Sequence, residues 1–145
     1  MEIEKLSKEE FIDTMRGEPT VRFTNMGLVH FNKAAVKHLG LCDKKGIYGI
    51  VNICRDRKNK ADFGVFVDSE GWQLRKESSG GAVFNNVGLA RHVIDATWER
   101  CQSHAVGAVG AVGAVKPSSV VFRIARLPLD DDKNKDVFAL LRKKE

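Results

Sequence analysis

Four cationic side chains within six residues make the stretch 55–60 the strongest candidate binding site in this sequence. Arg55, Arg57, Lys58 and Lys60 share the stretch with a single acid, Asp56. Guanidinium and ammonium groups at this density bind phosphate groups, and the binding weakens as salt rises because condensed counterions are released. Charges on a turn also keep a hairpin tip solvated and discourage aggregation, so a tip without a partner is the alternative.

Five further cations are candidates to join that site if the fold brings them near it. They are Arg22, Lys33, Lys37, Lys44 and Lys45. The chain of 145 residues has a formal net charge of +5, and residues 19–100, with thirteen basic and eight acidic side chains, carry the same net charge. A sequence pI of about 9.2 suits a partner made of phosphates, such as double-stranded DNA.

No arrangement of catalytic residues is predicted, because serine, histidine and aspartate do not occur with the local spacing of a known catalytic motif. The loop from Ser78 to Gly81 is glycine-rich but lacks the remaining residues of a phosphate-binding loop. His38 and His92 occupy matching helix positions, where two histidines could pair to bind a metal or sense pH. No carboxylate or thiol spacing accompanies them, so partly buried helix residues are expected instead. We therefore expect no enzyme, no metal site and no cofactor.

The composition, 43% hydrophobic and 30% charged, fits one soluble domain with its own core. No apolar run has the length of a membrane span, and the N-terminus is acidic where a signal peptide would be basic and then apolar. Cys42, Cys54 and Cys101 are odd in number and form no CxxC pair, so a disulfide framework is not expected. These patterns predict a cytoplasmic protein that does not bind membranes.

Residues 19–68 read as one β-β-α-β-β unit. Asn32 is placed to cap the helix, and Gly40 is placed to end it in a left-handed conformation. β-branched and aromatic residues fill the predicted strands. The predicted elements are strands over Thr20–Thr24 and Leu28–Phe31, a helix between Asn32 and Gly40, and strands over Ile47–Ile53 and Phe63–Val67.

Residues 71–142 repeat this order. Phe31 and Asn32 precede Phe84 and Asn85 by 53 residues (84 − 31), and Phe63 precedes Phe138 by 75 (138 − 63). An internal duplication is the simplest account, with coincidence between short matches as the alternative. The predicted elements are strands over Trp72–Lys76 and Ala82–Phe84, a helix capped by Asn85 or Asn86 and ending near Arg100, and strands over Val120–Ala125 and Val137–Leu141.

Two segments stand apart from the units. Residues 1–18 are predicted to form an accessory helix, because Ser7 and Glu10 make a capping box ahead of a Gly17 and Pro19 stop. Its apolar residues are Leu6, Phe11, Ile12 and Met15, and this side is expected to lie on the domain or on a second subunit. The low-complexity insert at 104–117, with glycine every third residue, is expected to be a flexible connection.

From Gly27 to Val51 the sequence resembles the AbrB/MazE-like swapped-hairpin domains of bacterial transition-state regulators and antitoxins. The motif of that family is a glycine turn, a short apolar strand, a proline-lysine helix start, Leu-Gly-Ile/Leu, a charged turn and an apolar strand. Here it reads GLVHF, NKAAVKHL, GLCDKKG and IYGIV without a gap. The resemblance covers the first unit well and the second unit weakly.

The resemblance implies a fold that is mostly β with two or three helices (α+β). In that family two β-β-α-β-β chains exchange hairpins to close one barrel, so two units in one chain imply a single pseudo-twofold swapped-hairpin or cradle-loop barrel over 19–145. One unit alone buries little apolar surface, which also favours a shared core. Trp72 and Trp98 are expected to be core anchors.

The resemblance also implies a small non-enzymatic DNA-binding regulator or antitoxin-like protein. One departure matters for that function, since family members that bind DNA usually carry an arginine after the turn glycine, and here Leu28 and Gly81 stand at that position. The missing arginine would remove a contact to phosphate or to a base edge. The alternative is a protein-interaction module that keeps the barrel without binding DNA, with a protein partner or a homodimer formed through the N-terminal helix.

Overall fold

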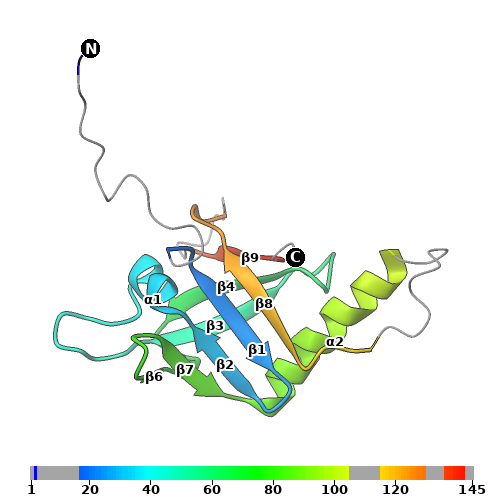
Figure 1. Cartoon of the computed structure of the whole chain (residues 1–145), viewed down its shortest axis with the longest axis horizontal. Helices are drawn as coiled ribbons and strands as arrows, with labels where there is room; N and C mark the ends of the chain where they lie inside the picture. Colours follow the sequence, from blue (N-terminus) through cyan, green and yellow to red (C-terminus); the bar gives the residue numbers. More distant parts are fainter. Residues whose placement is uncertain (1, 3–16, 105–114, 130–135, 143–145) are drawn as a thin grey trace.

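The computed structural model describes residues 2, 17–104, 115–129 and 136–142, and within them the chain forms nine strands and two helices (Figure 1). The predicted helix over 1–18 and the insert at 104–117 lie almost wholly outside the described residues. The elements are β1 (Thr20–Thr24), β2 (Leu28–Phe31), α1 (Lys33–Leu39), β3 (Ile50–Arg55), β4 (Phe63–Asp68), β5 (Trp72–Gln73), β6 (Arg75–Lys76), β7 (Ala82–Asn85), α2 (Val87–His104), β8 (Ser119–Ile124) and β9 (Phe138–Arg142).

All strand pairs are antiparallel, and the nine strands form one sheet in the order β5-β3-β4-β9-β8-β1-β2-β7-β6. The two end strands, β5 and β6, are consecutive in the chain and are separated only by the buried Leu74. The predicted single strand Trp72–Lys76 is therefore wrong in detail, because the chain turns at Leu74 and pairs with β3 on one side and β7 on the other. The sheet nearly closes into a barrel, which confirms the expectation of a mostly β, barrel-like fold with helices.

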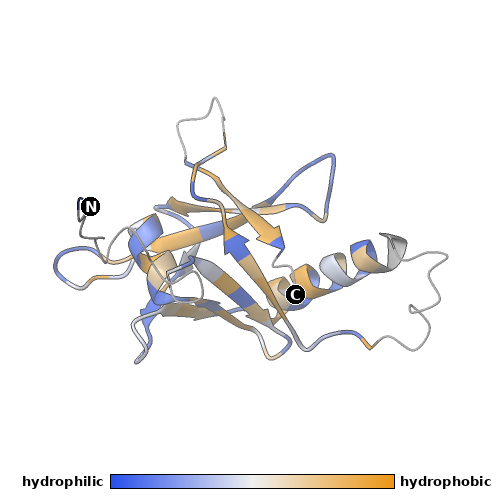
Figure 2. Ribbon diagram, turned by 45° about the horizontal axis from the view of Figure 1, so that its top comes forward, coloured by the Kyte–Doolittle hydropathy of each residue, from blue (hydrophilic) through white to orange (hydrophobic). Residues whose placement is uncertain are grey.

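The strands form because their inward residues are large and apolar at alternate positions. Val21 and Phe23 in β1, and Val29 and Phe31 in β2, are fully buried, while the residues between them face outward. The ring of Phe31 lies 6.5 Å from that of Phe84, centroid to centroid. Trp72 stacks on Phe84 at 5.3 Å with an angle of 9° between ring planes, so it packs against the core as predicted. Trp98 was also predicted to anchor the core, but it is only partly buried and does not belong to the residues that form or pack against it. Figure 2 shows the hydrophobic residues gathered on the strands and the hydrophilic ones at the turns.

Both helices begin at an asparagine. The side chain of Asn32 accepts a hydrogen bond from the backbone N–H of Ala35 at 2.8 Å, and Gly40 ends α1 at φ 64°. Asn86 accepts from the N–H of Leu89 at 2.9 Å, and α2 continues to His104, beyond the predicted end near Arg100. Among the described residues, neither helix has the length and apolar character that crossing a membrane requires.

The strand predicted over Ile47–Ile53 begins later, at Ile50. Ahead of it, Cys42 and Tyr48 form an isolated antiparallel bridge, and the N–H of Gly49 donates to the carbonyl of Leu41 at 2.8 Å. These bonds keep the segment in a tight corner after α1, so Ile47 is 62% exposed instead of lying in a sheet. The sequence pattern missed this corner because apolar residues continue through it.

Candidate nucleic-acid interface

The nine predicted cations lie in separate places. Lys44 and Lys45 lie on the turn before β3, and the stretch 55–60 begins at the other end of the same strand. Figure 2 shows these two hydrophilic loops at opposite ends of the barrel. Lys33 and Lys37 are exposed on α1. Arg22 lies in the middle of β1, so the nine residues do not form one continuous surface.

The outer surface of strands β8, β1, β2, β7 and β6 gathers other polar and cationic side chains with Arg22. We call this surface the basic sheet face. Its residues alternate with the buried core residues of the same strands, so they point away from the barrel. They are Thr20, Arg22, Thr24, His30, Arg75, Asn85, Ser119 and Arg123.

Two arginines lie symmetrically about the centre of this face. Arg22 is directly opposite His30, His30 is opposite Val83, and Val83 is opposite Arg75. Three strand spacings separate the two arginines in this row, which is about 14 Å at the usual spacing between neighbouring strands. The two central strands of the row, β2 and β7, are therefore flanked by one arginine on each side.

These two arginines are not neutralised by carboxylates within the described part of the chain. Arg22 makes no ion pair there, and Arg75 donates a hydrogen bond to the side-chain oxygen of Asn85. The acids near the face are already engaged, since Glu77 lies 2.5 Å from Nε2 of His30 and Glu18 lies 3.5 Å from Arg123. Arg22 and Arg75 are thus available to an external anion.

Two more cations border the face. The aliphatic chain of Lys33 lies against Gly80, where an added Cβ would come within 3.2 Å of it. Arg91 of α2 donates from Nε to the carbonyl of Asn25, in the turn between β1 and β2, at 3.1 Å. The sequence prediction included Arg22 and Lys33 but missed Arg75, Arg91 and Arg123. A signal for Arg75 was present, because it follows Arg22 by 53 residues (75 − 22), the same offset that relates Phe31 to Phe84.

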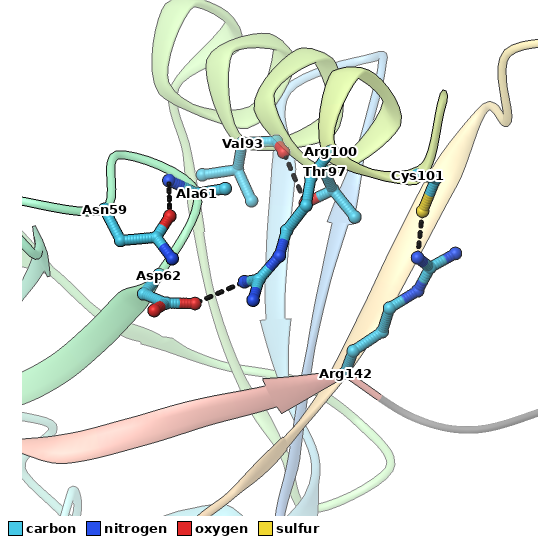
Figure 3. Close-up of polar contacts among 8 residues, drawn as sticks. All are labelled: Asn59, Ala61, Asp62, Val93, Thr97, Arg100, Cys101 and Arg142. Carbon is cyan, nitrogen blue, oxygen red and sulfur yellow. Dashed lines mark hydrogen bonds and ion pairs between the residues drawn. The ribbon is translucent and has the colours of Figure 1, made fainter. Parts of the chain in front are cut away.

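The stretch 55–60 forms the tip of the β3–β4 hairpin, and we call it the basic tip. Asp56 accepts from the N–H of Lys58 at 2.8 Å, and the backbone of Asp56 and Asp62 closes the turn at 2.9 Å. Figure 3 shows Asp62 paired with Arg100 of α2. The tip is therefore a defined turn docked on α2, and acids lie among its cations.

The two histidines do not pair with each other. Nε2 of His38 lies 3.0 Å from the carbonyl oxygen of Ala125, and its ring packs edge-on against Phe138 with centroids 5.1 Å apart. His92 lies edge-on against Phe63 at 6.2 Å. Among the described residues no group of three or more histidine, cysteine or acidic side chains is placed to hold a metal ion.

The glycines of the loop before β7 serve the sheet. Gly80 adopts φ 93° in the turn that its N–H closes on the carbonyl of Glu77. At Gly81 an added Cβ would lie 2.4 Å from the carbonyl oxygen of Phe31, so only glycine lets β7 approach β2 this closely. Close backbone packing therefore explains this glycine-rich stretch without a bound phosphate.

The thiols lie in three different environments, and no disulfide joins them. Figure 3 shows Cys101 of α2 in contact with the guanidinium of Arg142. Cys42 lies beside Tyr48 in the corner after α1. Partial burial, helped by the neighbouring Cys42 thiol, raises the pKa of Tyr48 above its ordinary value of 10.0.

The part of the outer surface of β3, β4 and β9 nearest the basic tip is apolar, and we call it the apolar face; Asn52 and Asp68 lie beyond it on the same strands and bond each other. Small residues form one row across it, since Cys54 is opposite Gly64 and Gly64 is opposite Ala139. Larger side chains stand on both sides of this row, so the face is hollowed into a groove of about 900 Å³. The groove is lined on this face by Cys54, Gly64, Phe66, Leu129, Val137, Ala139 and Leu141, with Arg55, Asp56 and Asp62 at the end nearest the basic tip.

The likeness of residues 27–51 to AbrB/MazE-like domains concerns one local pattern. The elements in that stretch lie where the pattern predicts a turn, a strand and a capped helix. Membership of that family stays a prediction, because comparison of the whole chain with protein-family models, with curated proteins and with solved structures found no match.

Proposed function

We propose that this protein is a small, non-enzymatic DNA-binding regulator or antitoxin-like protein that contacts double-stranded DNA through its basic sheet face. The observation that carries the proposal is the pair Arg22 and Arg75. They stand at matching positions on either side of strands β2 and β7, without a carboxylate partner among the described residues. A duplex has twofold symmetry in its backbone, so a face with two equivalent cations suits it.

The dimensions of the face favour the major groove. That groove is about 12 Å wide and admits a two-stranded β-ribbon. Strands β2 and β7 continue into β1 and β6, so they would face the groove without entering it, and the arginines, about 14 Å apart by strand spacing, would reach the phosphates on its two sides. Thr24, Ser119 and Arg123 add further donors to the same surface. Contacts to phosphate dominate this set, so we expect the protein to bind duplexes of different sequence with similar affinity.

We also propose that the barrel arose by internal duplication, with units 19–68 and 71–142. The strand pairings support this, because each has a counterpart when β1, β2, β3 and β4 are equated with β5/β6, β7, β8 and β9. The pair β1–β2 then corresponds to β6–β7, β3–β4 to β8–β9, and β1–β8 to β3–β5. The pairs β2–β7 and β4–β9 join a strand to its own counterpart.

The registers are consistent with one pair of offsets. Thr20 is opposite Arg123, and Gln73 is opposite Ile50. If Gln73 is the counterpart of Thr20, the first strands of the two units are offset by 53 residues (73 − 20). The observed pairings then make Arg123 the counterpart of Ile50, which is an offset of 73 residues between the later strands (123 − 50). The sequence matches suggested 75 for the later hairpins, and a shift of two residues leaves every side chain on the same face.

Exchange of hairpins between the units belongs to the same proposal. Within the described strands, no ladder joins hairpin β1–β2 to hairpin β3–β4, and each is bonded to strands of the other unit. The histidines are consistent with this exchange. His38 of the first unit packs on Phe138 of the second, and His92 of the second packs on Phe63 of the first.

A titration of labelled duplex DNA at two salt concentrations tests the DNA-binding proposal. The full chain should bind a duplex of two helical turns, about 20 base pairs, and Arg22→Ala and Arg75→Ala should each weaken binding. Each variant should also reduce the slope of log affinity against log salt by about 1, since one phosphate contact is lost. Arg57→Ala, in the basic tip, is the matched control and should leave the slope unchanged.

Two results would count against this proposal. Undetectable binding at low salt would remove the DNA function, and equal losses in the Arg57 and Arg22 variants would remove the assignment to the sheet face. In the first case a protein-interaction module becomes the better proposal. The observation that favours this second function is the exposed apolar groove on strands β3, β4 and β9.

A further inference from the structure

We propose that the apolar groove on β3, β4 and β9 is the docking site of the chain's own N-terminal segment, residues 3–16. The segment would lie in the groove through its apolar residues Phe11, Ile12 and Met15. This contact borders the basic sheet face at Arg123 and leaves Arg22 and Arg75 open. The inference depends on the groove, on the point at which the segment joins the barrel, and on the charges of the segment and of the basic tip.

The groove exposes more apolar surface than the fold requires. Leu129 is 53% exposed and Leu141 is 42% exposed at its edges. The outward residues of these strands are not part of the core cluster, although two members of that cluster, Phe63 and Leu140, also line the groove. A contiguous apolar patch of this kind usually marks a contact surface.

The segment joins the barrel beside the groove. The carbonyl of Glu18 accepts from Nδ2 of Asn32 at 2.8 Å, and the carbonyl of Pro19 accepts from the N–H of Ile124 at 2.9 Å. The carboxylate of Glu18 pairs with Arg123, and Arg123 lies directly opposite Leu141, which lines the groove. The first described residues after the segment are therefore one strand away from the groove.

The N-terminal segment is long enough to reach the groove. Fourteen residues span about 21 Å as a helix and about 46 Å when extended, and one strand spacing is about 5 Å. Such a short tether gives the segment an effective concentration near the groove in the millimolar range. Binding in the same chain is therefore favoured over capture of a separate partner.

The charges and the apolar pattern of the N-terminal segment also fit its proposed docking site. Residues 1–18 carry six acidic and three basic groups, and the basic tip beyond the end of the groove carries four cations and one acid, although the charged residues that line the groove itself are Arg55, Asp56 and Asp62. Opposite charges of this kind orient a docking segment. Phe11, Ile12 and Met15 fall on one side at helical spacing, while Asp13 falls on the other. The acidic groups would then face solvent and the tip while the apolar side fills the groove.

Disulfide trapping in the full chain tests the proposal, because Cys54 lies in the groove. In a Cys42→Ser, Cys101→Ser background, Phe11→Cys should form an intrachain disulfide with Cys54 under mild oxidation, at a rate independent of protein concentration. Bridging requires the two Cα atoms within about 7 Å, and docking would hold residue 11 at that distance, whereas a merely tethered segment would bring residues 11 and 13 to Cys54 equally often. Asp13→Cys is the matched control and should react much more slowly.

The outcomes separate the possible occupants of the groove. Equal rates for the Phe11 and Asp13 variants would overturn docking. Disulfide-linked dimers that form faster at higher protein concentration would overturn docking in the same chain and assign the groove to a second copy. A second measurement avoids introduced cysteines, since Ile12→Ser should raise the alkylation rate of Cys54 and leave that of Cys42 unchanged. An unchanged Cys54 rate would contradict the proposal.

Discussion

The two outer faces of this barrel differ although they cover the same kind of core. On the basic sheet face, Arg22, Arg75 and Arg123 alternate with buried apolar residues of the strands. On the apolar face, Phe66 and Leu141 occupy the equivalent outward positions of β4 and β9. Packing of the core explains why the inward residues behind both faces are apolar. It does not explain the residue types at the outward positions of either face. The outward residues are therefore the part of the sequence that folding leaves free to serve binding.

The difference can be traced to single positions. In the middle of the basic sheet face, His30 and Val83 lie side by side with an arginine beyond each. In the middle of the apolar face, Gly64 and Ala139 lie side by side, and their small size leaves the groove. The basic sheet face therefore carries its charges on both sides of its centre, whereas the apolar face has small side chains at its centre. The former suits an extended anion and the latter suits an apolar side chain.

The largest predicted effect separates the core from both faces. Phe31→Ala and Phe84→Ala should each lower the free energy of unfolding by about 3–5 kcal/mol, since both rings are buried in one core. Urea denaturation measures this loss. Phe66→Ala, on the apolar face, should cost clearly less, because that ring is only partly buried. A loss at Phe84 as small as that at Phe66 would mean that the second unit does not share the core.

A smaller effect compares one glycine on each face. At Gly81 an added Cβ would meet the backbone carbonyl of Phe31 at 2.4 Å, and at Gly64 it would meet the side chains of Val137 and Cys54 at 3.0 and 3.1 Å. Side chains can shift to make room for the added methyl group, whereas the hydrogen-bonded backbone of a paired strand cannot. Gly81→Ala should therefore cost near the top of the usual 1–3 kcal/mol for overpacking, and Gly64→Ala near the bottom. Thermal unfolding of the two variants gives the order, and the reverse order would contradict it.

The helix caps, which lie between the two faces, should give still smaller effects. Asn86→Ala removes one capping bond and should cost about 1 kcal/mol. Asn32→Ala should cost more, because Asn32 also accepts from the N–H of Thr20 and donates to the carbonyl of Glu18. Chemical denaturation of both variants measures the difference. Equal costs would show that the bonds between Asn32 and the start of β1 add nothing to stability.

The smallest predicted effect concerns the corner where the chain passes from α1 to the apolar face. Tyr48 is the single tyrosine of the chain, so the ultraviolet absorbance of phenolate reports it alone. Its pKa should lie above 10.0, mainly through burial. The folded state then holds the phenol proton more tightly than the unfolded chain. The associated stability is present below about pH 10, the unfolded value, and is lost as pH rises through the folded pKa.

Replacing Cys42 by serine sharpens this titration. The variant should lower the pKa of Tyr48 only in part, because the thiol is the lesser cause of the shift. A full return to the ordinary value would contradict burial as the main cause. An unchanged pKa would show instead that the thiol of Cys42 has no electrostatic effect on Tyr48.

Most of the elements could be predicted because the signals for them are local. Asn32 and Gly40 bound α1 through bonds within one helical turn, and the alternation in β1 and β2 follows from burial of one face. The turn at Leu74 could not be predicted, since a five-residue stretch of strand-forming residues does not reveal that its two ends pair with different strands. Tertiary pairing decided that point.

The candidate site was predictable only in part, for a related reason. Arg22 and Lys33 were identified by charge, whereas Arg75 was missed, although it follows Arg22 by the repeat offset of 53 residues. The separation of Lys44 from the basic tip depends on the length and direction of β3, which charge patterns do not contain. The groove depends on the pairing of Gly64 with Ala139, which are 75 residues apart (139 − 64), so a reading of local sequence could not reveal it.

The turn at Leu74 has a consequence for aggregation. An open sheet has two edges whose unpaired backbone groups can recruit other chains. Here the two strands that would be those edges, β5 and β6, are two residues each and are joined through one buried residue. The N–H of Leu74 donates to the carbonyl of Gly49 at 3.0 Å, so one backbone segment occupies both rims. A proteolytic cut beside Leu74 would therefore release both edges at once and convert a self-contained fold into a template for assembly.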